Sequence, residues 1–342
     1  MAGIKVGLIT HAQGAHISSY LPALAAAPEA SSVVLCDAGG KWEASARKEL
    51  GDKLAKTYLD YKSLLEAEKP AMVLVSMEAA VAPPVIDAAL EAGCHVLAEK
   101  PSCIRAEDFL PLVKKAESKH QHLMLAFANR TNPSIREAKR ILDSGAIGQI
   151  YGLDMHLVAD QTRLKSPDYG KNWFAHKDRA GGGHLIWLGI HWLDLAMFLT
   201  GAKVTEVAGF TGVVGGSKFD VEDSSAVALR FDNGTFGTMN SGYYLDKGYH
   251  SLLKIWGSTG WIELRPKGGV PLVWYSTREG KPQTIEKFDG PEGYTPFVIE
   301  CVRACAGLQA PPTNSADALR ALQTVFACYD AASSGKSQRV GQ

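Results

Sequence analysis

A glutamate, a lysine and a proline follow directly on a short apolar run at His95–Ala98, and these charges are the first candidates for chemistry. If that run is a buried parallel strand, Glu99 and Lys100 lie at its carboxyl edge, where such sheets bind ligands. Pro101 restricts Lys100 to an extended backbone and so aims its side chain. A partly desolvated lysine has a pKa shifted toward neutrality and can share in proton transfer to a substrate hydroxyl. A surface ion pair between Glu99 and Lys100 is disfavoured, because neighbours on a strand face opposite ways.

A second group of reactive side chains follows the triple glycine Gly181–Gly183, which is expected to give a flexible entry to a helix from about His184 to Leu199. Helical spacing predicts one stripe that holds two histidines, a carboxylate and an indole, and such a stripe is costly to hide in a core. We therefore expect it to line a cleft. Its members are His184, Trp187, His191, Asp194 and Phe198.

The first 128 residues alternate between strand-like and helix-like segments. Ile4–Thr10 and Val33–Asp37 are apolar, β-branched runs typical of strands buried on both faces. This alternation predicts βαβ units and a doubly wound parallel sheet. The further segments are Leu21–Ala27, Trp42–Leu50, Tyr61–Glu68, Ala71–Ser76, Pro84–Ala92, His95–Ala98, Ala106–Lys119 and Leu123–Ala128.

The turn after the first strand has lost the glycines of the dinucleotide fingerprint G-x-G-x-x-G, whose three positions hold threonine or alanine. Because alanine is the next smallest residue and the helix N-terminus remains, we still expect this turn to bind a pyrophosphate. His11 or His16 either donates to phosphate or decorates an exposed turn, and the sequence leaves both open. The residues expected to cradle the pyrophosphate are Thr10, Ala12, Gly14, Ala15 and His16.

Asp37 ends the second strand about twenty residues beyond the turn, where a carboxylate accepts the adenosine ribose hydroxyls and repels a 2′-phosphate. The sequence therefore predicts NAD rather than NADP, and a helix cap is the weaker alternative for this aspartate. Ser76 and Glu99, at two further strand ends, are expected on the cofactor side. Asn129 and Arg130, just past another strand, are expected to border the nicotinamide or the substrate.

Composition narrows the class of protein. At 342 residues with a net charge of zero, the chain suits two domains, predicted at residues 1–128 and 129–342, and neither nucleic acid nor an anionic membrane is expected as a partner. We expect no secretory leader, no apolar run near the length of a membrane helix and no metal site, because the six cysteines are scattered. A cytoplasmic enzyme or binding protein is predicted.

The second half reads as strands separated by turns, with two closing helices at Tyr294–Cys305 and Ser315–Ala332. It predicts a large, mainly antiparallel sheet in an α/β domain, with the last helix packing back on the first domain. The strand-like segments are Ile150–Ala159, Val204–Val214, Ser225–Phe231, Thr235–Ser241, Ser251–Trp256 and Gly260–Leu264.

Several segments in order along the chain resemble the glucose–fructose oxidoreductase/inositol dehydrogenase/MocA (Gfo/Idh/MocA) family. They are ALEAGCHVLAEKP, FANRTNP, AGGGHLIWLGIHWLDLAMFLTG, WGSTGWIEL and DALRALQTVFACYDAASSGK. The resemblance implies a Rossmann domain followed by an α/β domain whose open sheet makes oligomer contacts, so a homodimer or homotetramer is expected.

The resemblance also implies roles for single residues. In the family pattern GGG-x-x-x-D-x-G-x-H-x-x-D, His191 matches the substrate-binding and catalytic histidine and Asp194 the last carboxylate. The first aspartate falls on Trp187, and an indole cannot accept a proton. Either Lys100 and His191 suffice, or a nearby group substitutes (His184, His176 or Asp178), or the activity is lost. Trp187 either stacks on a sugar or aglycone or packs between the domains.

These observations predict an NAD-dependent oxidoreductase that moves a hydride between nicotinamide and a secondary alcohol of a sugar, polyol or glycoside. Lys100 and His191 are the expected catalytic pair, with His184, Trp187, Asp194 and Arg130 binding the substrate. Two alternatives remain open. One is an NAD-dependent glycoside-cleaving enzyme that oxidises C3 transiently, and the other is a non-catalytic nucleotide-binding regulator.

Overall fold

The computed structural model describes residues 3–341, and the chain divides into two compact units. The first comprises the residues up to Thr131, Asp178–Gly181 and Pro291–Leu319. The second comprises Asn132–Lys177, Gly182–Gly290 and the residues from Arg320 onward. The first unit thus draws in two late segments that a single boundary after residue 128 does not anticipate.

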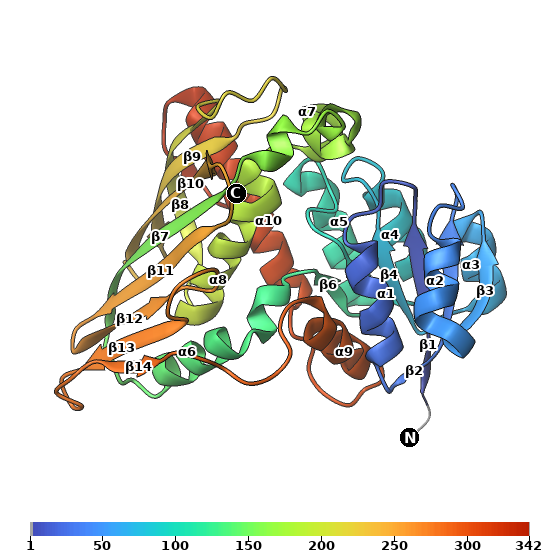
Figure 1. Cartoon of the computed structure of the whole chain (residues 1–342), viewed down its shortest axis with the longest axis horizontal. Helices are drawn as coiled ribbons and strands as arrows, with labels where there is room; N and C mark the ends of the chain where they lie inside the picture. Colours follow the sequence, from blue (N-terminus) through green and yellow to red (C-terminus); the bar gives the residue numbers. More distant parts are fainter. Residues whose placement is uncertain (1–2, 342) are drawn as a thin grey trace. The chain divides into compact units, whose positions relative to one another are not determined.

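The first unit is built on a six-stranded parallel sheet of strand order β3-β2-β1-β4-β5-β6 (Figure 1). This is the doubly wound order, with the reversal between β1 and β4. β1 and β4 have almost no exposed residues because helices flank both faces of the sheet. The strands are β1 Ile4–Thr10, β2 Ala30–Asp37, β3 Leu54–Tyr58, β4 Met72–Ser76, β5 His95–Ala98 and β6 Leu123–Leu125.

Five helices alternate with these strands, and a sixth comes from far along the chain. They are α1 Ile17–Ala26, α2 Glu43–Leu50, α3 Tyr61–Glu68, α4 Ala82–Glu91, α5 Ala106–Ser118 and α9 Tyr294–Cys305. α9 packs against α1 through Phe297, Val298 and Cys301 in the core. α9 thus belongs wholly to this unit, whereas α10 (Ser315–Ser334) is divided, with its residues up to Leu319 in the first unit and those from Arg320 on in the second.

The second unit holds a nine-stranded sheet of order β14-β13-β12-β11-β7-β10-β9-β8-β15, in which only β7 and β10 pair in parallel. The predicted open, mainly antiparallel sheet is confirmed. The strands are β7 Ile150–Asp160, β8 Val204–Gly212, β9 Ser224–Phe231, β10 Phe236–Leu245, β11 His250–Gly257, β12 Gly260–Leu264, β13 Leu272–Ser276, β14 Gln283–Ile285 and β15 Gln338–Arg339.

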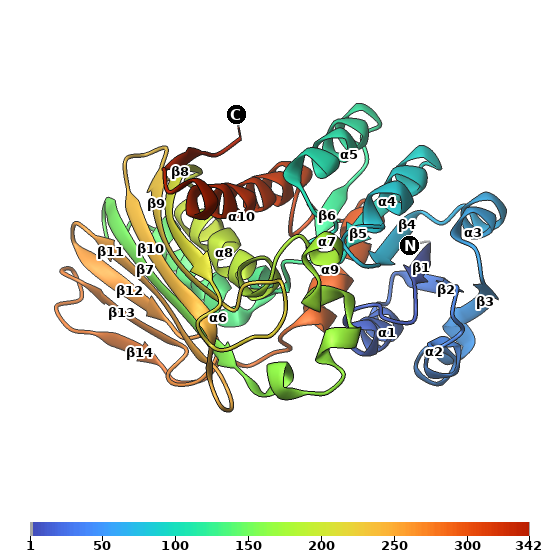
Figure 2. The same ribbon diagram turned by 90° about the horizontal axis from the view of Figure 1, so that it is seen from above.

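Helices α6 (Pro133–Asp143) and α8 (Ile190–Thr200) lie on one face of this sheet (Figure 2). Residues on that face, such as Met155, Met239 and Leu253, are buried. Among the described residues no helix covers the other face, where His156, Asn240 and Phe210 are exposed.

The stretch Lys177–Thr200, which carries the second group of candidate residues, is apolar and long enough to cross a membrane by length and composition. The expectation that no such run exists was therefore wrong. Within its most apolar window, however, 72% is buried inside the protein, as in the core helix of a globular domain.

Candidate functional site

The predicted cofactor residues meet at the carboxyl edge of the first sheet. Thr10, the last residue of β1, lies in register with Asp37 on β2 and with Ser76 on β4. Glu99 and Lys100 come directly after β5, which is the next strand beyond β4. The structure thus brings four strand ends together around the point where the strand order reverses, the usual ligand crevice of this fold.

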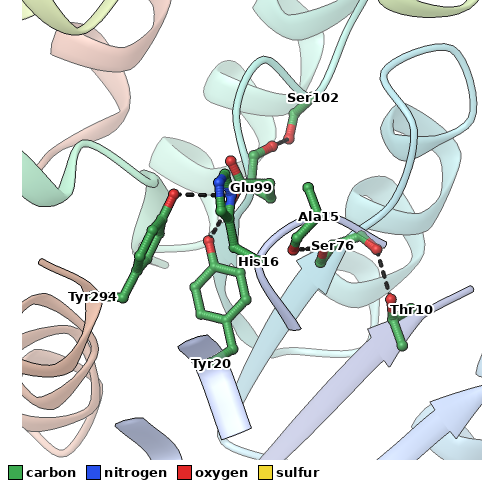
Figure 3. A network of polar contacts seen from close by, with 8 residues as sticks. All are labelled: Thr10, Ala15, His16, Tyr20, Ser76, Glu99, Ser102 and Tyr294. Atoms are coloured by element: carbon green, nitrogen blue, oxygen red, sulfur yellow. Dashed lines mark hydrogen bonds and ion pairs between the residues drawn. The ribbon is translucent and has the colours of Figure 1, made fainter. Parts of the chain in front are cut away.

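Side-chain hydrogen bonds hold the turn after β1 (Figure 3). Thr10 Oγ1 donates to the Ser76 carbonyl at 2.9 Å, and Ser76 Oγ donates to the Ala15 carbonyl at 2.7 Å. Gly14 passes so close that a Cβ there would meet Thr10 Oγ1 at 1.9 Å and the Ser76 carbonyl at 3.0 Å. The displaced glycine therefore has the role of close packing, and hydroxyl groups fix the backbone that the missing glycines would have shaped.

The same turn is also held by two residues that directly precede α2. Lys41 Nζ donates to the Ala12 carbonyl at 2.8 Å, and Trp42 Nε1 donates to the His11 carbonyl at 3.0 Å. The His11 ring accepts the Glu78 backbone N–H at 3.1 Å, and partial burial lowers the pKa of His11. His11 therefore ties the turn to the segment after β4.

Asp37 is buried, and both its oxygens accept backbone N–H groups of the following loop. Oδ1 accepts from Gly39 at 3.3 Å and Oδ2 accepts from Trp42 at 2.6 Å. Asp37 is not the cap of α2, whose N-cap position is Trp42, but its two hydrogen bonds fix the loop that leads to that helix. Each carboxylate oxygen has a second lone-pair direction, so these bonds leave acceptor capacity for a ribose.

A cluster that sequence reasoning did not anticipate surrounds Glu99 (Figure 3). His16 Nδ1 lies 3.1 Å from Glu99 Oε2 and 3.0 Å from the Tyr294 hydroxyl, and the Tyr20 hydroxyl donates to the same glutamate oxygen. His16 precedes α1 in left-handed backbone conformation (φ 57°). Its ring therefore contacts both the Glu99 carboxylate and the Tyr294 hydroxyl.

Glu99 is 1% exposed, yet it is held as a carboxylate. Burial alone would raise its pKa, but the His16 imidazole, the Lys100 ammonium and the Tyr20 hydroxyl together lower the pKa of Glu99 below its usual value. Burial and the charge of Glu99 raise the pKa of Tyr20 and Tyr294 well above normal, so both phenols stay protonated donors.

Tyr20 could have been found from sequence, since it lies four residues after His16 and one turn along the same helix face. Tyr294 could not, because it follows His16 by 278 residues on α9.

Lys100 is 1% exposed, lies two residues after the end of β5 and is joined to Pro101 by a cis peptide bond. A buried ammonium is costly unless charges and dipoles compensate it, and the neighbouring anionic Glu99 provides one such charge.

Among the predicted border residues, Asn129 is half-buried in the 3-10 turn Ala128–Thr131. Arg130 Nη1 pairs with Asp317 Oδ2 at 2.9 Å at the start of α10, so its guanidinium has a structural partner.

The triple glycine is tightly packed, which corrects the expectation of a flexible entry. Within the first unit, a Cβ on Gly181 would meet the Ile104 backbone at 3.0 Å, and Gly181 has a φ of +82°. Within the second unit, a Cβ on Gly182 would meet the Tyr329 hydroxyl at 2.2 Å, and one on Gly183 would meet the Glu222 carbonyl at 2.0 Å. The three glycines are thus needed for close approach.

Glu222 and Tyr329 complete this packing by capping the helix that follows. The Glu222 carboxylate accepts the backbone N–H groups of Gly183 (2.6 Å) and Leu185 (2.8 Å), and the Tyr329 hydroxyl at 2.9 Å. Tyr329 in turn accepts the Ile186 N–H at 3.1 Å. Burial raises the pKa of Glu222, and these donors oppose that rise. Sequence reasoning missed both residues.

Gly183→Ala is expected to destabilise the protein by about 1–3 kcal/mol and to lower turnover, because the new methyl collides with backbone and displaces the start of the helix. Thermal unfolding and steady-state kinetics measure the two effects. Gly212→Ala is the matched control, since its Cβ would meet nothing within 4 Å. Equal stability of the two variants would contradict this role of Gly183.

A π-helical turn, Leu185–Gly189, precedes α8 and divides the predicted stripe. His184 is buried and packs edge-on against Tyr243 of β10 (4.6 Å between centroids), whereas Trp187 packs against Trp173 and Phe174 on another side. Asp194 is also buried. The wider π turn shifts the register, so only His191, Trp187 and Phe198 of the five are half-buried.

Lys100 belongs to the first unit and His191 to the second, so each half of the candidate site is described within its own unit. No cluster of three or more histidine, cysteine, aspartate or glutamate residues suited to a metal ion occurs within residues 3–341.

The residues of the first unit fit a dinucleotide. Glu99 Oε1 is buried and has no hydrogen-bond partner among the described residues. A ligand donor such as a ribose hydroxyl would satisfy this acceptor. The first turn of α1 contains no acidic residue, so its N–H groups remain suited to a pyrophosphate. The fixed turn after β1, the unbonded Glu99 oxygen and the Asp37 carboxylate at the end of β2 are features that suit a bound dinucleotide.

Comparison with known proteins agrees with this geometry. Residues 5–127 match the oxidoreductase family model with an NAD-binding Rossmann fold, and residues 135–263 match the GFO/IDH/MocA C-terminal domain. The chain is 26% identical over 237 residues to D-glucoside 3-dehydrogenase of Escherichia coli strain K12, covering 65% of this chain and 66% of that protein. It is 25% identical over 229 residues to levoglucosan dehydrogenase of Pseudarthrobacter phenanthrenivorans, covering 61% of this chain and 58% of that protein. The matches thus span less than two thirds of these relatives.

Solved structures share the fold over the whole chain. An oxidoreductase domain protein from Kribbella flavida superposes with a TM-score of 0.89 at 23% identity, covering 100% of both chains. Levoglucosan dehydrogenase in complex with NADH and levoglucosan gives a TM-score of 0.86 at 20% identity, covering 99% of this chain and 100% of that one. Both domain models match in order, and the chain belongs to the Gfo/Idh/MocA family of oxidoreductases.

Proposed function

We propose that the protein is an NAD-dependent oxidoreductase that moves a hydride between nicotinamide and a secondary alcohol of a sugar, polyol or glycoside. The observation that carries the proposal is the buried Lys100 at the carboxyl edge of the sheet, beside a buried anionic Glu99. A protein that only binds nucleotide has no need to bury an ammonium there, so this feature argues against a non-catalytic regulator.

Bound NAD supplies a hydride acceptor at nicotinamide C4. In this proposal the loop after β1 holds the pyrophosphate, Asp37 accepts adenosine ribose hydroxyls, and Glu99 Oε1 accepts a ribose hydroxyl. His191 removes the proton of the substrate hydroxyl, and Lys100 Nζ donates a hydrogen bond to the same oxygen as charge develops on it. Trp187 replaces the family carboxylate, so these two groups perform the proton transfer without it.

A panel of sugars, polyols and glycosides, read by NADH absorbance with product analysis, tests the proposal. Formation of NADH with at least one substrate, together with the matching ketone, is the expected result. Binding of NAD without turnover on any member would instead favour the regulator. Release of an aglycone without net NADH would identify the glycoside-cleaving reaction, which the aromatic residue at position 187 favours because it offers a surface for an aglycone.

Asp37→Asn is expected to raise KM for NAD by about tenfold or more and to narrow the preference for NAD over NADP, because the variant loses a charged acceptor and the repulsion of a 2′-phosphate. Steady-state kinetics with both cofactors measure the change. Asp52→Asn, at an exposed aspartate in the turn Gly51–Lys53, is the control. If the ratio of KM for NADP to KM for NAD did not change, Asp37 would have no part in selecting the cofactor.

We further propose that the uncovered face of the second sheet binds a second copy of the chain, giving a homodimer or homotetramer. Phe210, Phe236 and Trp256 lie on that face and are 77%, 57% and 39% exposed. Large exposed apolar groups on one sheet face are typical of association surfaces. Light scattering should give at least twice the chain mass, and Phe210→Asp with Phe236→Lys should give a monomer. A monomeric wild-type protein would overturn this proposal.

A further inference from the structure

Trp187 and Phe174 form an aromatic platform on the second unit. Trp187 lies in the π turn before α8, about one helical turn before His191. Their ring centroids are 5.2 Å apart with an interplanar angle of 38°, and both side chains are half-buried. We propose that this platform binds a planar apolar group of the substrate, so that the preferred substrate is a glycoside with an aromatic aglycone. This inference rests on the proposed function, because it assigns the substrate class of the same site.

The platform is held in place by buried neighbours. Trp173 is 0% exposed and meets Trp187 edge-on at 5.4 Å, and Tyr169 is 6% exposed and meets Phe174 at 5.2 Å. The Phe219 ring also packs against Tyr169, with 4.9 Å between the ring centroids. Rings fixed by packing before a ligand arrives lose little conformational freedom on binding, so their surface contributes efficiently to affinity.

The backbone of the loop that carries these rings is fixed by its own contacts. His176 Nε2 lies 2.7 Å from the Gly170 carbonyl, and Asn172 Nδ2 donates to the Asp168 carbonyl at 2.8 Å. The Lys177 N–H donates to Asp220 Oδ1 at 3.0 Å. The loop therefore presents a defined aromatic surface.

The chemistry of the platform favours an aromatic group over a free sugar. A sugar ring carries hydroxyls around its edge that require polar partners, and the faces of aromatic rings such as Trp187 and Phe174 do not supply them. Two neighbouring rings at a modest tilt offer the offset-stacked and edge-on contacts that a third aromatic ring prefers.

The position of the platform suits a substituent on a sugar. Trp187 lies four positions before His191, across the junction of the π turn and α8, and four positions rise about 6 Å at α-helical spacing, close to the width of one pyranose ring. If the sugar hydroxyl meets His191, a group attached across the ring reaches Trp187. The platform thus recognises the aglycone, and the catalytic pair acts on the sugar.

The experiment compares phenyl and methyl D-glucopyranosides, each as both anomers, in kcat/KM and in binding to the NADH complex by calorimetry. At least one phenyl glucoside is expected to exceed its methyl counterpart by about tenfold in both measurements. Trp187→Leu is expected to remove that preference, so that the ratio of kcat/KM for the phenyl over the methyl glucoside falls to about one, because the stacking surface is lost. Phe174→Leu gives the same test should Trp187→Leu not fold.

Trp274→Leu is the matched control, because it removes another half-buried tryptophan, on β13. Equal values for phenyl and methyl glucosides, or a phenyl preference that survives both platform variants, would overturn the inference. Tighter binding of a phenyl glucoside that depends on Trp187, without any NADH formed, would support the platform and refute the proposed reaction. Turnover of both glucosides without a phenyl preference would support the proposed reaction and refute the platform.

Discussion

Lys100→Ala is expected to lower turnover by about a thousandfold or more while NAD binding remains measurable. The ammonium is the donor expected to stabilise negative charge on the reacting oxygen, and alanine removes both the donor and the charge. The cofactor contacts assigned to Asp37, Glu99 and the loop after β1 do not include the lysine, so the affinity for NADH should change far less than kcat. Stopped-flow hydride transfer and NADH fluorescence titration give the two values.

A matched comparison separates chemistry from folding. Lys100→Met keeps the length of the buried side chain and should lose activity as fully as Lys100→Ala, since methionine cannot donate a hydrogen bond. Lys139→Met removes a lysine that pairs with Asp143 on α6 and should retain full activity. Turnover of Lys100→Met close to that of the wild type would show that the ammonium has no part in the reaction.

His191→Asn is the second substitution with a large expected effect, a loss of about 10²–10⁴ in kcat. Asparagine keeps a polar side chain of similar reach but cannot take up a proton at neutral pH. The loss should shrink as pH rises, because hydroxide then replaces the missing base, and a pH profile of kcat measures this change.

His120→Asn is the control for His191→Asn. His120 is exposed and has a φ of 54°, a left-handed conformation that asparagine also adopts readily. This variant should retain wild-type kinetics. If His191→Asn showed the same kcat and pH profile as the control, the imidazole would not be the base.

Much of the fold was predictable because buried strands carry a strong signal. The apolar runs Ile4–Thr10 and His95–Ala98 were placed with their observed bounds, and the charges after them fell at the carboxyl edge as expected. β3 (Leu54–Tyr58) was missed because it is an edge strand with two exposed residues and only partly buried ones. β13, β14 and β15 were also missed, two of them being three residues long or shorter.

The candidate site was predictable only where its residues adjoin a strand end or a family motif. The π turn at Leu185–Gly189 has no periodic signature, so the expectation that His184 and Trp187 share a stripe failed. The triple glycine appeared flexible because its contacts, Ile104, Glu222 and Tyr329, come from distant segments. Such contacts arise from tertiary packing, which a pattern of neighbouring residues does not contain.

The most direct test of the account is a crystal structure of the protein with NADH and a glycoside that it oxidises or binds. Lys100 Nζ and a ring nitrogen of His191 are expected within about 3.2 Å of one and the same substrate oxygen, with the dinucleotide along the carboxyl edge of the first sheet. Two side chains that contact different atoms, or a dinucleotide bound elsewhere, would contradict it.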